Sequence, residues 1–325
     1  MNKLLSKIRD FLLERPVLSV LILFSIISIF IAPNFLTSIN LLNILKQASS
    51  LAIVACGVTF VVLNGGIDFS STSVIALSSV VGASIMTTDN GLMANSPFAV
   101  LVSILAMLII GIIFGVINGI SVIKFRMPSF IVTLATMMIG SGIAVWYTKA
   151  ETIYNLPKSF NFIGSGKILF IPIAVLIAAV MILIMWFILS KTLYGRQVYA
   201  VGTNPKASFI SGIPVKKTIL KMFIISGICA SISGVVMTAQ LESGAPGLGS
   251  NMFLDIIASI IIGGTSIYGG SGTIIGTVIG VLFLTVMNNS LNLMSVSWFI
   301  ISVIKGLIIL IAAFSDVIKI RIVEK

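Results

Sequence analysis

Long apolar runs that recur along the whole chain restrict its fold more than any other feature. Each run spans about 17 to 25 residues, the length at which a helix crosses the roughly 30 Å hydrocarbon core of a bilayer. The chain has a mean hydropathy of +1.20, with 58% hydrophobic residues and only 9% charged residues. A soluble domain of this composition would expose apolar patches that water does not tolerate. The sequence therefore predicts an all-α, polytopic membrane protein.

Ten membrane spans are predicted from these runs. The ends of the second, third and eighth are the least sharp, because glycine and hydroxyl residues interrupt them. The first run follows a basic leader, but that leader also carries Asp10 and Glu14, and no small-residue cleavage site follows. We therefore expect a retained span rather than a cleaved signal. The predicted spans are residues 17–32, 46–63, 72–87, 97–122, 129–147, 168–189, 218–240, 251–263, 274–293 and 297–315.

The basic residues predict the orientation of these spans. Fifteen of the 20 lysines and arginines fall in segments that share one side of a ten-span topology, and lysine and arginine accumulate on the cytoplasmic side. We expect a cytoplasmic N-terminus (1–16), one membrane domain (17–315) with a cytoplasmic loop (190–217), and a cytoplasmic tail (316–325). Because the bases lie in loops, the net charge of +11 does not indicate a nucleic-acid partner.

The chain lacks the residue patterns of most enzymes. It has no histidine, no cluster of metal ligands and no carboxylate pair at catalytic spacing. The stretch GSGKI resembles a phosphate-binding loop, but Asn161 and Ile168 stand where that motif needs glycine and Ser or Thr. Cys56 and Cys229 lie inside apolar runs and are interpreted as packing thiols. We expect no catalytic residue, no metal and no cofactor on this chain.

A stripe of glycines in the fourth span predicts a close helix contact. Gly111, Gly115 and Gly119 repeat every four residues, so they share one helix face and allow a neighbour to approach closely. We assign this face to packing within one subunit rather than to a dimer contact.

Ionisable and amide side chains inside the predicted spans are candidates for a transport pathway. A charge at a helix centre costs about 2.5–3.5 kcal/mol on insertion scales, so Asp255 and Lys305 need a partner or a wet cavity. Either they line a pathway, or Lys305 is satisfied by carbonyl groups at a helix crossing. Thr133, Thr136 and Asn292 are further polar groups that could face a lumen, a lining that suits a neutral hydroxylated solute better than an ion. The pathway candidates are Asn64, Asp255, Asn288, Asn289 and Lys305.

Two glycine-rich breaks interrupt the apolar pattern at cytoplasmic ends of spans. They cover residues 61–73 and 261–276. Non-helical backbone at membrane depth is tolerated only where protein or a wet cavity covers it. The segments are either a pair of tight turns or hinge backbone beside a transport pathway. The gating candidates are Gly65, Gly66, Asp68, Gly263, Gly264, Gly269 and Gly270.

The polar stretch GRQVYAVGTNPKASFISGIPVKK contains a short predicted helix. Asn204 followed by Pro205 is a helix start, and Gly212 is a helix stop. The helix between them exposes Phe209 and Ile210, and it is too short to be stable alone in water. It must dock either on its own subunit or in the groove of a partner.

Five stretches together resemble the ribose-type, simple-sugar branch of ABC importer permeases. They are GGIDFSSTS, KFRMPSFIVTLATM, YGRQVYAVGTNPKASFISGIPV, GLGSNMFLDIIASIIIGGTSIYGGSGTIIGTVIG and NNSLNLMSVSWFIISVIKGLIIL, which run in order between residues 34 and 314. The chain departs from the usual pattern at Phe69, Ser71 and Thr72, which affects only the expected local hinge geometry.

This resemblance implies a bacterial plasma (inner) membrane importer with several partners. They are a second permease copy (the same chain or a close paralogue), a cytoplasmic ABC ATPase that holds ATP and Mg, an extracytoplasmic sugar-binding protein, and the membrane lipid. It also implies that the helix bounded by Asn204 and Gly212 couples to the ATPase. The alternative is an ion-coupled secondary transporter of a small polar solute, with Asp68, Asp255 and Lys305 as the coupling set. The sequence does not identify the sugar.

Overall fold

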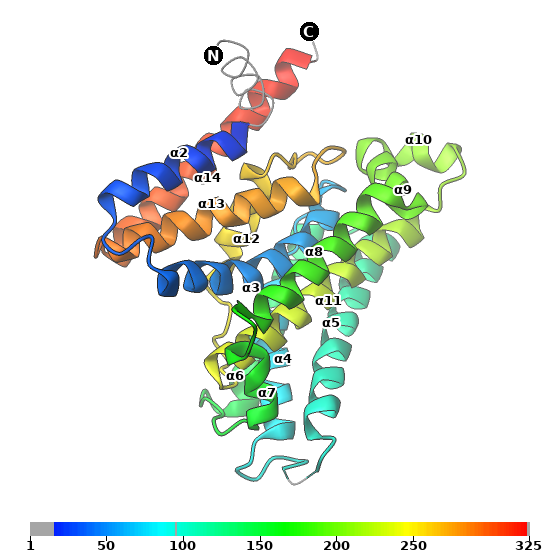
Figure 1. The fold of residues 1–325 in the computed structure, drawn as a ribbon. Coiled ribbons are helices and arrows are strands. Elements are labelled where there is room, and N and C mark those ends of the chain that lie inside the picture. Colours follow the sequence, from blue (N-terminus) through cyan, green and yellow to red (C-terminus); the bar gives the residue numbers. More distant parts are fainter. Residues whose placement is uncertain (1–15, 95, 324–325) are drawn as a thin grey trace.

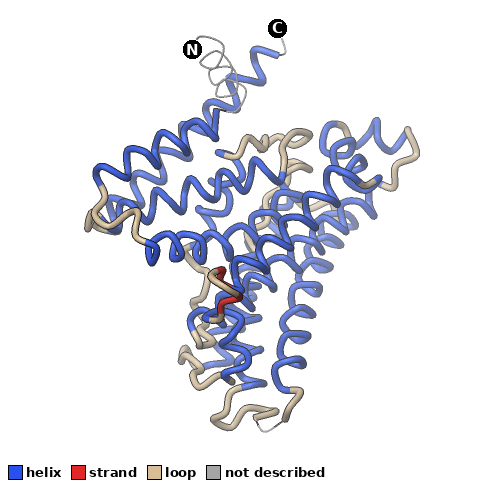
Figure 2. Tube along the Cα trace, viewed as in Figure 1, coloured by secondary structure: helices blue, strands red, loops and turns tan. Residues whose placement is uncertain are grey.

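The computed structural model describes residues 16–94 and 96–323, which form thirteen helices and one short hairpin. Figure 2 shows how little strand there is among the helices. The elements are α2 (Pro16–Ile31), α3 (Ser38–Val62), α4 (Ser71–Met86), α5 (Ala99–Lys124), α6 (Ser129–Thr148), α7 (Lys158–Ser165), β1 (Lys167–Ile168), β2 (Ile171–Pro172), α8 (Ile173–Lys191), α9 (Leu193–Thr203), α10 (Pro205–Ile210), α11 (Val215–Leu241), α12 (Met252–Ile262), α13 (Ile274–Leu293) and α14 (Trp298–Val323).

The all-α, polytopic prediction is confirmed at this level. Within the described residues, six helices are long and apolar enough to cross a bilayer: α3, α5, α6, α8, α11 and α13. The predicted span at 251–263 forms α12, which has 11 residues and is therefore about 16 Å long, half the hydrocarbon thickness. The exact count of ten spans stays a prediction.

The most hydrophobic helices lie on the outside of the molecule. The most apolar 18-residue stretches of α5 and α8 have mean hydropathies of 3.1 and 2.9, but only 28% and 22% of their residues are buried. The corresponding stretch of α3 has a lower hydropathy of 1.7 and is 83% buried, and that of α11 is 61% buried. This inverts the pattern of a soluble protein, because lipid rather than water surrounds the outer helices.

The glycine stripe of α5 packs against α11 in the same chain. A Cβ added at Gly111 would overlap the backbone of Gly227, and one at Gly115 would lie 2.6 Å from the carbonyl oxygen of Phe223. The two helix backbones therefore touch, which only glycine permits. The prediction of packing within one subunit is confirmed.

Local sequence signals explain where several elements start. Thr37 caps α3, accepting a hydrogen bond from the backbone of Asn40, so this helix begins eight residues before the predicted span. The predicted span at 168–189 begins late instead, because the β1–β2 hairpin occupies its first residues and α8 starts after Pro172. Helices α7 and α9 were not predicted as separate elements.

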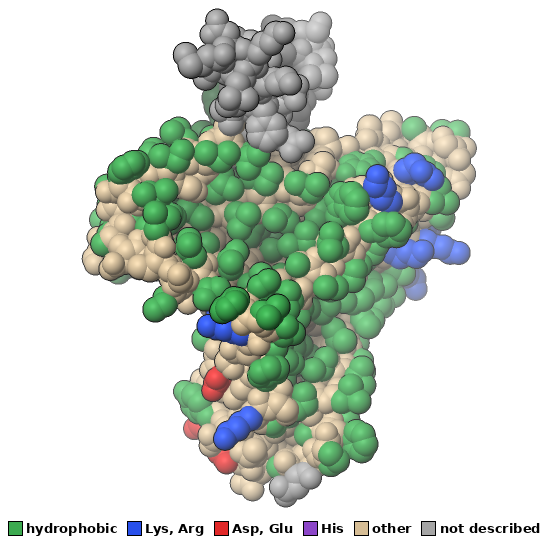
Figure 3. Space-filling model, viewed as in Figure 1, with side chains coloured by type: hydrophobic (Ala, Val, Ile, Leu, Met, Phe, Trp, Pro, Cys, Tyr) green, Lys and Arg blue, Asp and Glu red, His purple; other side chains and the backbone are tan. Residues whose placement is uncertain are grey.

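Elements that belong to the two predicted sides of the membrane separate in space. In Figure 1 the start of α2, the end of α14 and the α9–α10 pair lie at one end of the molecule, and α7 and the loop between α4 and α5 lie at the other. On the face in Figure 3, most Lys and Arg side chains gather near α9 and α10, and the Asp and Glu side chains lie at the opposite end. The basic side chains of residues 1–15 and of the tail 316–325 lie outside the described side chains.

Candidate functional site

Helix α10 forms as its flanking residues predict. The side-chain oxygen of Asn204 accepts a hydrogen bond from the backbone N–H of Ala207 at 3.0 Å, and Pro205 occupies the first turn. Gly212 follows the helix with a φ of +81°, a left-handed conformation that glycine adopts without the steric cost of a Cβ. The predicted caps are thus present at both ends.

Helix α10 directs its large apolar side chains away from the rest of the chain. Phe209 is 74% exposed and Ile210 is 85% exposed, whereas Ser208 is the buried residue of the helix. The described part of the chain therefore leaves most of both apolar side chains uncovered. A six-residue helix with two exposed apolar groups at its end is suited to insertion into the groove of another protein.

Helix α9 joins α10 to both glycine-rich segments. The Tyr199 hydroxyl donates to the carbonyl oxygen of Gly272 at 2.7 Å. A Cβ at Gly202 would overlap the carbonyl oxygen of Leu63, and that same oxygen accepts the N–H of Gly270 at 2.9 Å. Burial raises the pKa of the Tyr199 phenol, so this hydroxyl stays protonated and able to donate at neutral pH.

The two glycine-rich segments are tight turns that lie against each other. Gly65 has a φ of +70° and Gly270 a φ of +77°, and a Cβ at Gly65 would lie 3.2 Å from the carbonyl oxygen of Tyr268. Gly269 also lies against the backbone of Leu63. The remaining gating candidates differ from one another: Gly66 packs on α3 and α6, Gly263 packs on α13, and Gly264 has open space around it. Motion of these turns stays a prediction.

Asp68 belongs to a buried hydrogen-bond network rather than to a charge pair. Its carboxylate accepts the hydroxyls of Ser70 and Ser226, each at 2.6 Å. Asn118 donates to the Ser70 hydroxyl and accepts from Thr136, both at 2.8 Å. This network ties the start of α4 to α5, α6 and α11. Thr136 therefore serves helix packing, and its expected place in a lumen is wrong; Thr133 likewise bonds the backbone of Ile67.

Asp255 and Lys305 are each other's partner. The Lys305 ammonium lies 2.9 Å and 3.0 Å from the two carboxylate oxygens of Asp255, which joins α12 to α14. Their side chains are 16% and 19% exposed, respectively. The expectation of a compensating partner is confirmed, and the partner of Lys305 is a carboxylate rather than carbonyl groups. Asp68 does not join this pair, so the structure does not assemble the coupling set of an ion-driven transporter.

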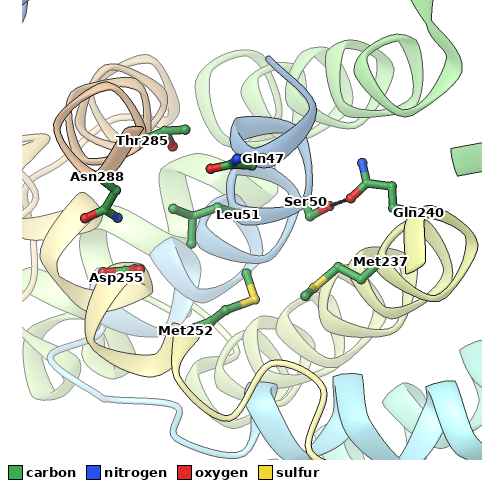
Figure 4. Close-up of a pocket in the computed structure, with 9 residues that line it drawn as sticks. All are labelled: Gln47, Ser50, Leu51, Met237, Gln240, Met252, Asp255, Thr285 and Asn288. Carbon is green, nitrogen blue, oxygen red and sulfur yellow. Dashed lines mark hydrogen bonds between the residues drawn. The ribbon is translucent and has the colours of Figure 1, made fainter. Parts of the chain in front are cut away.

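A pocket of about 220 Å³ opens between α3, α11, α12 and α13. Figure 4 shows Gln47, Asn288 and Asp255 around one side of it, and Met237 and Met252 around the other. Two of the predicted pathway residues, Asp255 and Asn288, line this pocket. The complete lining is Gln47, Ser50, Leu51, Met237, Gln240, Met252, Asp255, Thr285 and Asn288.

The other amide candidates lie elsewhere. Asn289 exchanges two hydrogen bonds with Asn40, at 2.8 Å and 2.9 Å, which join α13 to α3. Asn64 is at the end of α3, and its side-chain oxygen is buried without a partner among the described residues. The sequence analysis missed Gln47 and Gln240. Their signal is a glutamine within an apolar run, the same signal that identified Asn288.

The family described as branched-chain amino acid transport system / permease component matches residues 40–313. The chain is 40% identical to the ribose import permease protein RbsC of Bacillus subtilis, over 93% of this chain and 91% of the relative. It is 38% identical to the D-allose transport system permease protein AlsC of Escherichia coli, over 87% and 84%. It is 34% identical to the galactose/methyl galactoside import permease protein MglC of Escherichia coli, over 95% of both chains. No solved structure matches the chain.

The chain belongs to this family of transport-system permeases. Within it, the chain is a ribose-type permease of the ABC importer class, a transmembrane subunit of the bacterial inner membrane rather than an enzyme. This agrees with six helices capable of spanning a bilayer among the described residues and with the exposed Phe209 and Ile210 of α10 at the basic end of the molecule.

Proposed function

We propose that this chain is the membrane-spanning half of an ATP-driven importer for a simple, ribose-like sugar that an extracytoplasmic binding protein delivers. The printed substrates of its relatives, ribose, D-allose and galactose, support this sugar class. The observation that carries the proposal is the pocket between α3, α11, α12 and α13, whose lining combines amide and hydroxyl side chains with apolar ones and whose one carboxylate is neutralised by Lys305. Such a lining suits a neutral hydroxylated solute better than an ion.

Helix α10 is proposed to dock in a groove of a cytoplasmic ABC ATPase. Asn204, Pro205 and Gly212 shape the helix, and Phe209 and Ile210 supply the apolar contact. ATP and Mg would be held by that partner. Its ATPase domains would be either one fused chain or two copies.

The glycine-rich turns are proposed as hinges at the inner mouth of the pathway. Their gating residues would be Gly65, Gly66, Asp68, Gly263, Gly264, Gly269 and Gly270. Support comes from α9, because Tyr199 and Gly202 place the backbone of both turns in contact with the helix that leads to α10. A displacement of α10 would therefore reach both turns through a few direct contacts.

We further propose a dimer of permeases, formed by two copies of this chain or by this chain and a close paralogue. Ten spans would place both termini, residues 1–16 and 316–325, and the loop 190–217 in the cytoplasm, on either side of a single permease domain (17–315). Single cysteines at Thr203 and Asn155 test this topology. In intact cells an impermeant thiol reagent should label only the cysteine at Asn155, and labelling at Thr203 would contradict the topology.

Transport itself is tested in liposomes that contain this chain, its ATPase and its binding protein. Uptake of labelled D-ribose, D-allose or D-galactose should require ATP and the binding protein. The permease alone under a sodium or proton gradient should take up nothing. Gradient-driven uptake without the ATPase would refute the ATP-driven mechanism, and ATP-driven uptake of leucine in place of all three sugars would refute the sugar class.

A further inference from the structure

The pocket between α3, α11, α12 and α13 has polar groups whose hydrogen-bonding capacity is not used within the described residues. Gln47 makes no hydrogen bond there, although its side chain carries two donors and an acceptor. The Asn288 side-chain oxygen is buried without a partner among the residues that the structure describes, and an amide oxygen left in that state costs free energy. Gln240 makes only long bonds, at 3.2 Å and 3.3 Å. A ligand with hydroxyl groups would satisfy these amides.

The charges around the pocket favour a neutral ligand over an ion. Asp255 is the one charged residue of the lining, and both of its oxygens already face the Lys305 ammonium. The pair is neutral as a whole, so a cation gains little and an anion meets the carboxylate. Each carboxylate oxygen keeps a lone pair that can accept a hydroxyl. The charge pattern therefore favours a neutral ligand that donates hydrogen bonds.

The opposite side of the pocket is apolar. Met237 and Met252 line it, whereas Leu51 lies beside Gln47 and Asp255 (Figure 4). Methionine is a flexible side chain that fills irregular gaps. A sugar ring has one face of C–H groups and an edge of hydroxyls, and it matches a cavity with one apolar side and one amide side. The volume of about 220 Å³ lies below the roughly 300–1,000 Å³ of pockets for drug-sized ligands, which limits the ligand to a small molecule.

The pocket is separated from the glycine-rich turns along α3. Leu51 lines the pocket and Leu63 accepts the hydrogen bond from Gly270, and twelve helical residues correspond to about 18 Å. The stretch of α3 between these residues is buried. A molecule in the pocket is therefore held apart from the turns, which lie at the end where α9 and α10 are found.

We propose that this pocket is a low-affinity subsite for one neutral monosaccharide, in which Gln47, Asn288 and Asp255 bind the hydroxyls and the two methionines contact the ring. The assignment rests on the proposed import of a sugar. It concerns the permease itself, before the sugar passes the inner turns. Few direct hydrogen bonds and a half-open cavity fit weak binding, which a pathway needs so that its cargo can leave.

Protection of a cysteine placed in the pocket tests this subsite without ATP or partner proteins. The native Cys56 and Cys229 are buried, so Gln47→Cys in the full-length purified permease provides an accessible pocket thiol. With a dissociation constant of about 5 mM, about 50 mM D-ribose would fill most sites and slow thiol labelling about tenfold. D-galactose and D-allose are tested in parallel, and L-leucine is the comparator that the family description suggests.

Asn43→Cys provides the matched control, because Asn43 lies one turn earlier on α3, is exposed and does not line the pocket. Its labelling rate should not change with sugar. Slowing at position 47 by a sugar and not by leucine supports the subsite. Because Gln47→Cys removes one of the proposed hydroxyl-binding groups, Ser50→Cys, a nearly isosteric change at another lining position, is labelled in parallel. Equal labelling rates at both positions with and without every sugar, or protection by leucine alone, would overturn the subsite.

The outcomes also separate the subsite from the transport proposal. Protection of the cysteine at position 47 without ATP-driven uptake by the wild-type chain would refute the importer and leave the subsite in place. Uptake by the wild-type chain without any protection would refute the subsite alone.

Discussion

The two glycine-rich turns (61–73 and 261–276) and the pocket differ in which atoms make their contacts. At the turns, backbone meets backbone: Gly202 lies against Leu63, and Gly270 donates to the same carbonyl. At the pocket, side chains from four helices surround an open volume, and some of their polar atoms have no partner within the described residues. The contact of Gly202 with Leu63 therefore tolerates almost no added atom, whereas pocket residues can be exchanged with graded effects. A hinge that transmits motion needs such close backbone contacts, and a weak binding site needs side chains around an open volume.

The largest effect is expected from adding side-chain atoms where the backbones of α9 and the first glycine-rich turn touch. Gly202→Val places a Cβ and two methyl groups against the Leu63 carbonyl. Overpacking of this kind costs typically about 1–3 kcal/mol, and more where backbone cannot yield. Uptake should be lost, and the thermal midpoint of the purified permease should fall. Gly142→Ala is the control, since nothing lies within 4 Å of its added Cβ. Equal stability of the Gly202→Val and Gly142→Ala variants would contradict the close contact between Gly202 and Leu63.

A selective loss is expected at the exposed end of α10. Phe209→Asp places a carboxylate in the proposed ATPase contact, and an unpaired charge at a desolvated contact costs about 2–5 kcal/mol. Co-purification of the ATPase and uptake should both fall at least tenfold. The stability of the permease should not change, because Phe209 is 74% exposed. Phe209→Leu keeps an apolar group and should retain most of the binding. Full recovery of the ATPase with Phe209→Asp would mean that α10 is not the docking helix.

Breaking the Asp255–Lys305 pair should have an intermediate effect on the stability of the permease. Lys305→Met leaves a carboxylate without its ammonium partner. Removal of one partner of a fully buried pair costs about 3–5 kcal/mol, and the partial exposure of this pair should reduce that cost. We expect lost uptake with normal membrane levels. Adding Asp255→Asn to Lys305→Met should restore part of the stability. Wild-type uptake by Lys305→Met would leave the pair a purely structural role.

The smallest effects distinguish two neighbouring amides. Asn289→Ala removes two hydrogen bonds to Asn40 and should lower the free energy of unfolding by about 1–3 kcal/mol. Asn288→Ala removes a side-chain oxygen that has no partner in the described part of the chain, so stability should hold while uptake falls several-fold. Thermal denaturation and uptake of the same two preparations test this contrast. Equal loss of stability in both variants would contradict the distinction between a packing amide and a pocket amide.

The sequence predicted what depends on neighbours along the chain. Helix α10 was predicted almost to the residue, because an Asn–Pro start and a glycine stop are local signals. A close contact of α5 within the subunit followed from glycine spacing alone, but its partner α11 is known only from the structure. The partner of Lys305 did not, since Asp255 lies 50 residues away in the chain and carbonyl groups were an equal alternative.

The sequence did not predict which neighbour each side chain of a helix faces. Asn288 and Asn289 are adjacent, and only the three-dimensional packing shows that one lines the pocket and the other bonds to Asn40. Helix α9 was missed because it is short and polar, and its importance lies in contacts with residues that are far away in the sequence, such as Gly272 and Leu63.

In this account the glycine-rich turns couple ATP hydrolysis to transport and the pocket binds the sugar. The most direct test of these two roles is the number of sugar molecules imported per ATP hydrolysed. Tyr199→Phe removes the hydroxyl that donates to Gly272 and keeps the ring, so the ATPase should still bind and hydrolyse ATP. The account predicts that this ratio falls for Tyr199→Phe, whereas Asn288→Ala slows uptake and leaves the ratio near that of the wild type. A wild-type ratio for Tyr199→Phe, or a fall confined to Asn288→Ala, would contradict it.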